Sequence, residues 1–374
     1  MKIGIITQSF YPIKGGVTEH VYHLYKGLEK LGHKVTVITA NFTGFDDDFG
    51  MRVIRIGRDL TIPINGAFCN MTVGLELVNK LKKIEKEEKF DLVHIHCPLN
   101  PVLPLLAIKH IEAPKIGTFH SYMEKNILFE IFKDQLGKLS NKLDGRIAVS
   151  EVCREFFSRY FPAEYRIIPN GVDIRRFSPE IQPLDEFKDD NLNILFVGRM
   201  DPRKGFKYLL QAFPIIYNRI PKARLIVVGN GFLRHWYNLS LPNILQSRVK
   251  YQNFVPAKKM PQYYASADIF CSPAVGGESF GIVLLEAMAS QKPIVASDIK
   301  GYNSLIKNGQ EGILVEAKNP LALAEGLIEL GKNKKKREKM GKMGREKALG
   351  YSWDKVVKEI EKYYFEVLAK TKKK

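Results

Sequence analysis

The first half of the chain alternates between short apolar runs and amphipathic segments. The apolar runs are rich in Ile and Val and are bounded by Gly, Pro, Asn or charged residues. They lie at residues 2–7, 34–39, 51–56, 92–96 and 115–120, and apolar residues recur at helical spacing at about 17–31 and 72–88. Near-continuous apolar strands of this kind are typical of a parallel sheet that helices cover on both faces. We therefore predict an α/β domain over residues 1–171.

The alternation begins again after the polar segment 178–191, SPEIQPLDEFKDDN, whose prolines and clustered acidic residues indicate a linker. Further strands are predicted at 193–199, 223–231, 267–273, 292–297 and 312–316. They give a second α/β domain over residues 172–351. The segment 352–374 has apolar residues at helical spacing and is predicted to cross back to the first domain. The expected fold is two Rossmann-like, doubly wound domains that face one another across a cleft.

Composition and charge narrow the class of protein. The 374 residues are 45% apolar and carry a net charge of +18, and the four cysteines have no CxxC spacing. A charge of this size favours an anionic partner: nucleic acid, an anionic membrane or a phosphorylated substrate. Residues 331–374 hold 16 of the Lys and Arg and 6 of the Asp and Glu, so much of the charge is local. No run of about 18 apolar residues and no leader peptide is evident, which predicts a cytosolic protein.

Glycines and a histidine lie where the strands of the first domain end. Ligands of open α/β sheets bind at the carboxyl ends of the strands. Gly15 and Gly16 directly precede the first predicted helix, whose free amide groups suit an anion, although a glycine-permitted turn explains them equally well. His120 directly follows a strand. It either points into the cleft or makes a structural hydrogen bond.

Three cations lie in one predicted loop of the second domain. Arg199, Arg203 and Lys204 fall between a strand and a helix, in the segment VGRMDPRKGF. Their spacing suits a diphosphate, and the alternative is a solvated surface charge run.

Two glutamates stand out in the segment GGESFGIVLLEAMA. Gly276 and Gly277 let the backbone approach a ligand, and Glu278 precedes a helix that we expect to begin near Ser279. Glu286 lies inside an apolar helical pattern, where an unpaired carboxylate is costly. We expect its partner to be either the hydroxyls of a ligand such as a ribose or a nearby Lys or Arg.

These motifs together resemble a known family. GGVTEH, FH at residues 119–120, IPNGVD, GRMDPRKG and GGESFGIVLLEAMA are similar to the motifs of retaining GT-B glycosyltransferases, which include sucrose-phosphate synthase and the phosphatidylinositol mannosyltransferases. The resemblance covers the whole chain and is strongest to the mannosyltransferases that add the first mannose. It implies an acceptor-binding first domain and a second domain that binds a nucleotide sugar.

The resemblance also implies roles for individual residues. The backbone of Gly16 would approach the donor diphosphate, and Arg199 and Lys204 would carry its charge in place of a metal. Glu286 would hold the ribose, and His120 would lie beside the sugar and the reacting centre. Glu278 would grip the donor sugar together with the backbone amides of Ser279, Phe280 and Gly281. The catalytic set is then His120, Glu278, Arg199 and Lys204. No tightly bound cofactor and no metal site is implied, and a divalent cation would not be essential.

The acceptor side of the resemblance is less complete. Asn65, His120, Lys125 and Arg203 match positions that bind an inositol phosphate headgroup, but residues 67–72, AFCNMT, lack the arginine that the family has there. The implied reaction transfers mannose from GDP-mannose to a phosphatidylinositol-type lipid, or to a small polyol phosphate, at the inner face of the cell membrane. The alternative is a UDP-sugar-dependent enzyme of the same fold with a soluble or different lipid acceptor.

The remaining basic residues leave two interpretations. Lys80, Lys82, Lys83 and Lys86 form a patch suited to an anionic membrane surface, but Glu85, Glu87 and Glu88 lie among them, so a solvated helix face is equally consistent. A basic nucleic-acid-binding protein is the remote alternative. We expect no nucleic-acid partner, because the sequence contains no nucleic-acid-binding module and no basic-aromatic stripe.

Overall fold

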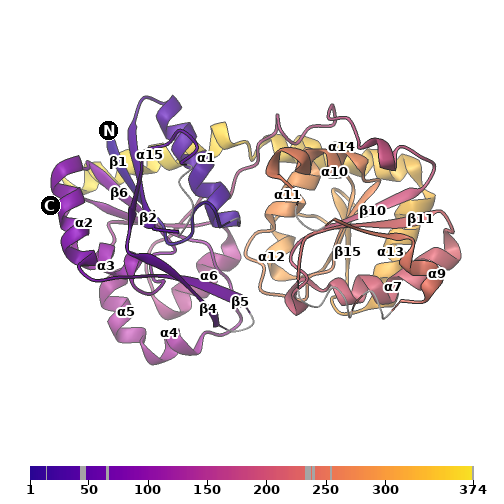
Figure 1. The fold of residues 1–374 in the computed structure, drawn as a ribbon, viewed down its shortest axis with the longest axis horizontal. Helices are drawn as coiled ribbons and strands as arrows, with labels where there is room; N and C mark the ends of the chain where they lie inside the picture. Colours follow the sequence, from indigo (N-terminus) through magenta and orange to yellow (C-terminus); the bar gives the residue numbers. More distant parts are fainter. Residues whose placement is uncertain are drawn as a thin grey trace. The chain divides into compact units, whose positions relative to one another are not determined.

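The computed structural model folds into two compact units, each built on a parallel sheet (Figure 1). One unit comprises Met1–Gly171 with Trp353–Lys374, and the other comprises Val172–Ser352. The structure describes residues 1–13, 15–42, 48–64, 67–231, 237, 241–252 and 255–372. Within these residues, no helix combines the length and the apolarity that crossing a membrane requires.

The first unit has a seven-stranded sheet in the order β3-β2-β1-β6-β7-β8-β9, with all neighbours parallel. Its strands are β1 Lys2–Ile6, β2 Lys34–Ala40, β3 Val53–Ile56, β6 Leu92–His96, β7 Lys115–Phe119, β8 Gly145–Ala148 and β9 Arg166–Ile167. The strand order changes direction between β1 and β6. Ligand sites of open α/β sheets occur at such a switch point, outside the carboxyl ends of the strands.

Helices cover both faces of this sheet. They are α1 Gly16–Lys30, α2 Leu77–Glu88, α3 Leu103–His110, α4 Ile127–Ile131, α5 Lys133–Ser140, α6 Glu151–Tyr160 and α15 Trp353–Thr371. Because strand side chains alternate between faces, Ile5 packs in one core cluster and Ile6 in the opposite one. Figure 1 shows α15 (yellow) alongside α1 (indigo), where Gly27 lets the helices approach: a Cβ there would lie 2.6 Å from a methyl group of Val357.

The segment 58–73 forms two strands that were not predicted. We expected a helix over about 72–88, but the chain forms an antiparallel hairpin of β4 Arg58–Ile64 and β5 Ala67–Val73, and α2 begins only at Leu77. The predicted helix is therefore correct from Leu77 to Glu88 and wrong before it.

The second unit has a six-stranded parallel sheet in the order β12-β11-β10-β13-β14-β15. The strands are β10 Leu192–Val197, β11 Ala223–Val228, β12 Val249–Gln252, β13 Ile269–Ser272, β14 Ile294–Ser297 and β15 Gly312–Val315. Strand β12 was not predicted. The order changes direction between β10 and β13, so this sheet is also doubly wound and the predicted α/β class is confirmed.

The helices of the second unit lie on both faces of its sheet. The α-helices are α7 Phe206–Arg219, α9 Asn243–Gln246, α10 Met260–Ser266, α11 Ile282–Ala289, α12 Lys300–Asn303, α13 Pro320–Lys332 and α14 Lys334–Leu349. Short 3-10 helices are η1 Asp185–Phe187, η2 Pro202–Lys204 and η3 Ala257–Lys259. The loops after β10 and β13, on either side of the switch point, carry the predicted site residues of this unit except Glu286, which lies on α11.

Candidate functional site

The cationic loop after β10 is held in shape by Asp201 and Gly205. Asp201 caps η2 by accepting a hydrogen bond from the Lys204 amide at 3.2 Å, and its carboxylate pairs with Arg199 Nη2 at 3.2 Å. Gly205 has a φ of +68°, and a Cβ there would lie 1.8 Å from the Pro273 carbonyl oxygen. Only glycine allows this turn to pack directly against the end of β13.

A buried carboxylate lies beside that loop. Glu278 is 9% exposed, and its Oε1 lies 2.8 Å from Lys204 Nζ and 3.1 Å from Arg203 Nη1. Arg203 Nη1 also donates to the Gly277 carbonyl at 2.6 Å. Neither ion pair uses Oε2. The structure thus brings together residues from two separate sequence motifs, and it neutralises a carboxylate whose burial alone would be costly.

The backbone around Glu278 is fixed by close packing. Gly277 has a φ of +68°, and a Cβ at Gly301 would lie 1.8 Å from the Glu278 carbonyl oxygen. We expected the following helix to begin near Ser279, but α11 begins at Ile282, because Gly281 is left-handed with a φ of 90°. The amides of residues 279–281 therefore lie in the turn before the helix. Phe280 buries its ring in the core.

Glu286 has a tyrosine partner. The Tyr264 hydroxyl, on α10, donates to Glu286 Oε2 at 2.6 Å. Burial, followed by the charge of Glu286, raises the pKa of Tyr264 well above its usual 10. The tyrosine therefore stays protonated at neutral pH and remains a hydrogen-bond donor to the carboxylate.

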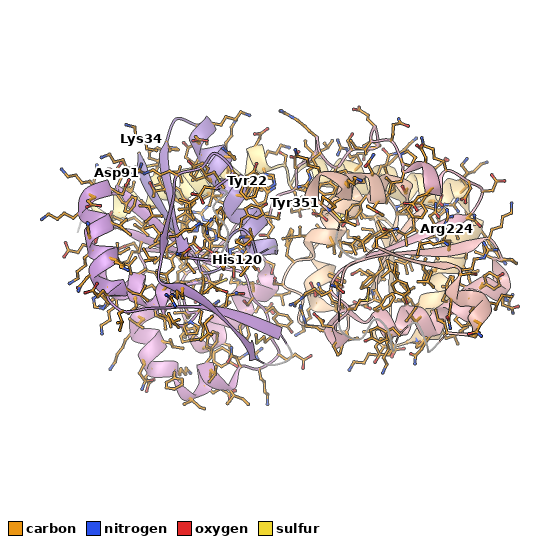
Figure 2. The ribbon with its side chains drawn as sticks, viewed as in Figure 1. Tyr22, Lys34, Asp91, His120, Arg224 and Tyr351 are labelled. Atoms are coloured by element: carbon orange, nitrogen blue, oxygen red, sulfur yellow. The ribbon has the colours of Figure 1, made fainter. Side chains whose placement is uncertain are left out.

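In the first unit, His120, which is labelled in Figure 2, belongs to a cluster of histidines at the carboxyl ends of β6 and β7. His96 is the last residue of β6, and its Nδ1 lies 2.9 Å from His120 Nε2. His94 stacks on His96 with ring centroids 4.4 Å apart. Both nitrogens of His94 are hydrogen-bonded, to the Tyr364 hydroxyl at 2.6 Å and to Thr118 Oγ1 at 2.5 Å.

His20 joins the cluster from α1. Its Nδ1 lies 2.9 Å from Asn170 Oδ1, and its ring centroid is 4.9 Å from that of His120. Burial is the main cause of low pKa values here: the pKa of His20 falls to about 4, that of His94 to about 3, and those of His96 and His120 lie well below 6.5. These rings are neutral at neutral pH. His20, His96 and His120 also bring one nitrogen each within 4.8 Å of one another, as metal ligands do.

Sequence reasoning singled out His120 but missed His20 and His96. His20 lies in the motif GGVTEH, and His96 ends the predicted strand at 92–96. Position in the sheet was the signal that could have identified His96. It ends a strand that pairs with the strand directly before His120. The presence of His20 beside them depends on the docking of α1, which the sequence pattern does not reveal.

The remaining predicted site residues are Gly16, Lys125, Asn65 and Arg203. Gly16 is the first residue of α1, after the N-cap Gly15, where helical amides have no intrahelical partner. Lys125 lies exposed in the segment between β7 and α4. Asn65 lies outside the described residues. Arg203, which the resemblance groups with these acceptor residues, belongs to the second unit and contacts Glu278 there.

Comparison with family models matches both units of the chain. Residues 14–176 match the glycosyltransferase family 4 model, and residues 178–347 match the model for glycosyl transferases group 1.

Similar individual proteins extend over nearly the whole chain. The phosphatidyl-myo-inositol mannosyltransferase of Mycobacterium tuberculosis is 33% identical over 371 residues, which cover 97% of this chain and 96% of that protein. Among solved structures, a glycosyltransferase from Rickettsia africae has a TM-score of 0.78 at 20% identity and covers 98% of both chains. The Anabaena protein HepE, solved with UDP and glucose, has a TM-score of 0.77 at 20% identity, over 97% of this chain and 99% of its own. At these identities the structures show the fold alone.

Proposed function

Because this chain belongs to the family of GT-B glycosyltransferases, we propose that it transfers mannose from GDP-mannose to a phosphatidylinositol-type lipid, with retention at the anomeric carbon. Similarity to a phosphatidyl-myo-inositol mannosyltransferase over 97% of the chain is the observation that carries the sugar and the acceptor class. The geometry of the second unit supports a nucleotide-sugar donor.

The donor diphosphate is assigned to Arg199 and Lys204. They lie in one loop at the carboxyl end of β10, and the side chain of Lys204 is 18% exposed, so its charge is only partly screened by water. The Gly16 amide is assigned to the same diphosphate. Glu286, oriented by the Tyr264 hydroxyl at 2.6 Å, is assigned to the ribose hydroxyls.

The donor sugar is assigned to Glu278. Because Lys204 and Arg203 both contact Oε1, the other oxygen, Oε2, is available to accept hydrogen bonds from sugar hydroxyls. The amides of Ser279, Phe280 and Gly281 precede α11 and supply donors on the same loop. His120 is assigned to the sugar and the reacting centre.

Transfer then depends on charge stabilisation. Negative charge develops on the leaving diphosphate as the glycosidic bond breaks, and fixed cations beside it lower the barrier. The leaving phosphate oxygen accepts the proton of the acceptor hydroxyl, which attacks on the face that the phosphate leaves. The configuration is retained, and no side chain serves as a covalent nucleophile.

The acceptor is a membrane lipid on this proposal, so the enzyme acts peripherally at the inner face of the cell membrane. Asn65, His120, Lys125 and Arg203 are assigned to the phosphoinositol headgroup. For membrane contact we propose α2, where Lys80, Lys82, Lys83 and Lys86 are all exposed and Leu75, just before the helix, is 90% exposed. Exposed basic residues beside an apolar side chain suit the interface of an anionic bilayer.

A product screen tests this function. The purified chain is incubated with a mixed pool of GDP- and UDP-sugars and a total polar lipid extract, and the products are identified by mass spectrometry. We expect a hexose on phosphatidylinositol, formed from GDP-mannose. A product that requires a UDP-sugar, or a water-soluble acceptor that reacts much faster than any lipid, would replace this proposal with the alternative donor and acceptor classes.

A further inference from the structure

We propose that His20, His96 and His120 form a binding site for a transition-metal ion such as Zn²⁺ or Ni²⁺. One nitrogen of each ring lies within 4.8 Å of the other two. Imidazole nitrogens suit Zn, Ni and Cu ions, whereas Mg²⁺ prefers oxygen ligands. All three residues belong to the first unit, whereas the cations assigned to the donor diphosphate belong to the second.

His20 has the tautomer that a metal ligand requires. The carbonyl oxygen of Asn170 can only accept a hydrogen bond, so His20 Nδ1, at 2.9 Å, carries the ring proton. The lone pair is then on Nε2, which is buried and has no hydrogen-bond partner among the described residues. A histidine that donates one ring N–H to a carbonyl and presents the other nitrogen is the usual arrangement around bound metals.

His96 also has an unpartnered buried nitrogen, Nε2, within the described part of the chain. Its Nδ1 is 2.9 Å from His120 Nε2. Tetrahedral Zn²⁺, with Zn–N bonds of about 2.0–2.1 Å, holds its ligand nitrogens about 3.3 Å apart. Metal binding therefore replaces the contact between His96 and His120 and draws one nitrogen of each ring, now within 4.8 Å of the others, to that spacing. His120 is the least buried of the three rings and is therefore the one that can move.

His94 is the neighbouring ring that we exclude as a ligand, because its two nitrogens bond Tyr364 and Thr118. It supports His96 by stacking against it. Imidazole binds a metal ion in its neutral form. A divalent ion that is coordinated by three imidazoles has a fourth coordination position for water or an anionic oxygen.

A metal ion at this site should affect catalysis, and this expectation rests on the proposed function. His120 is placed at the reacting centre, so an ion bound to it removes it from that role. Ni²⁺ and Zn²⁺ should therefore inhibit transfer, and Mg²⁺ should not. Binding itself is independent of the transfer assignment and can be measured without substrate.

The direct test is titration of the untagged, EDTA-treated chain with NiCl₂, followed by calorimetry and by fluorescence of Trp353, whose ring centroid lies 5.1 Å from that of His20. A Trp236→Phe background leaves Trp353 as the one tryptophan. We expect one equivalent of Ni²⁺ to bind and to quench the fluorescence. His20→Gln or His96→Gln should weaken binding at least tenfold, and Asn170→Ala by roughly 10–100-fold. The control His110→Gln, at a half-buried histidine on α3 outside the cluster, should change it less than twofold.

Equal affinity in the wild type and both ligand variants would overturn the proposal, as would an equal loss in His110→Gln. A buried substitution can unfold the chain, so a second measurement uses no ligand variant. Electron paramagnetic resonance of Cu²⁺ bound to the wild type should show coupling to imidazole nitrogens. Absence of that coupling would also overturn the site. If Ni²⁺ binds but does not inhibit glycosyl transfer, that result would instead count against the role of His120 in transfer.

Discussion

Lys204 Nζ lies 2.8 Å from Glu278 Oε1, and Arg203 Nη1 reaches the same oxygen at 3.1 Å. The cation that we assign to the donor diphosphate thus neutralises the carboxylate that we assign to the donor sugar. Because Arg203 remains as a second partner, removing Lys204 does not leave Glu278 as an isolated buried charge. Substitutions in this loop should therefore report on ligand binding more than on folding.

We predict that Lys204→Ala weakens nucleoside diphosphate binding by roughly 1.5–3 kcal/mol, because one charge-assisted contact is lost. Arg199→Ala should cost less, since its side chain is 53% exposed against 18% for Lys204 and is more screened by solvent. Isothermal calorimetry measures both. Lys207→Ala, an exposed lysine on α7, is the matched control. If both variants bind like the wild type, the diphosphate assignment is wrong.

We predict that His120→Ala and Glu278→Gln lower the rate of transfer more than they lower nucleoside diphosphate affinity, because both residues are assigned to the sugar and the reacting centre. Each should cost at least about tenfold in single-turnover rate, the loss of one hydrogen bond to a charged or reacting group. Dissociation constants are measured on the same preparations. Near-normal rates in both variants would leave these residues with a structural role only.

We predict that Glu286 and the ribose interact directly. Removal of the ribose 2′ and 3′ hydroxyls from the nucleoside diphosphate should cost the wild type roughly 1.5–3 kcal/mol of binding, and the same change should cost Glu286→Gln much less. Tyr264→Phe should give an intermediate result, because it removes the 2.6 Å hydrogen bond that orients the carboxylate. Calorimetry measures how the wild type and the two variants each bind the nucleoside diphosphate with and without its ribose hydroxyls, which completes a double-mutant cycle. Fully additive losses would show that Glu286 does not contact the ribose.

We predict that adsorption to anionic vesicles depends on α2 and weakens with salt. Each Lys near such a surface contributes about 1 kcal/mol and is screened at high ionic strength. Changing Lys80, Lys82, Lys83 and Lys86 together to Gln should abolish most co-sedimentation at low salt. The control changes Lys334, Lys335, Lys339 and Lys342 to Gln, which removes the same charge from exposed positions on α14. Equal losses in the two variants, or salt-independent adsorption, would exclude α2 as the docking surface.

The sequence predicted most of the sheet and helix order, because buried parallel strands and amphipathic helices have distinct local periods. It did not predict the hairpin of β4 and β5. Each strand of this hairpin is stabilised by pairing with the other, as between Thr61 and Asn70. The apolar residues at the end of β5 also continue into the apolar pattern that predicted α2. The predicted start of α11 near Ser279 was wrong because the left-handed Gly281 directly precedes the helix, which begins at Ile282.

The sequence identified many residues of the site, but it did not predict which of them contact one another. The loop with Lys204 and the glutamate Glu278 were both recognised, but their pairing joins positions 74 residues apart and follows from the strand order β10-β13. The hydroxyl partner of Glu286 lies 22 residues earlier, on α10. The histidine cluster depends on α1 and two strands meeting at one end of the sheet. Such contacts are properties of the tertiary fold and have no local pattern.

The most direct measurement is transfer from GDP-mannose to phosphatidylinositol in vesicles, with the anomeric configuration of the product determined by NMR. The account predicts a mannosylated lipid with the configuration of the donor, formed by the wild type and the Lys207→Ala control and strongly reduced in Lys204→Ala. A product of inverted configuration would contradict the mechanism. The absence of any mannosylated lipid, with transfer from another nucleotide sugar to a different acceptor, would contradict the proposed function.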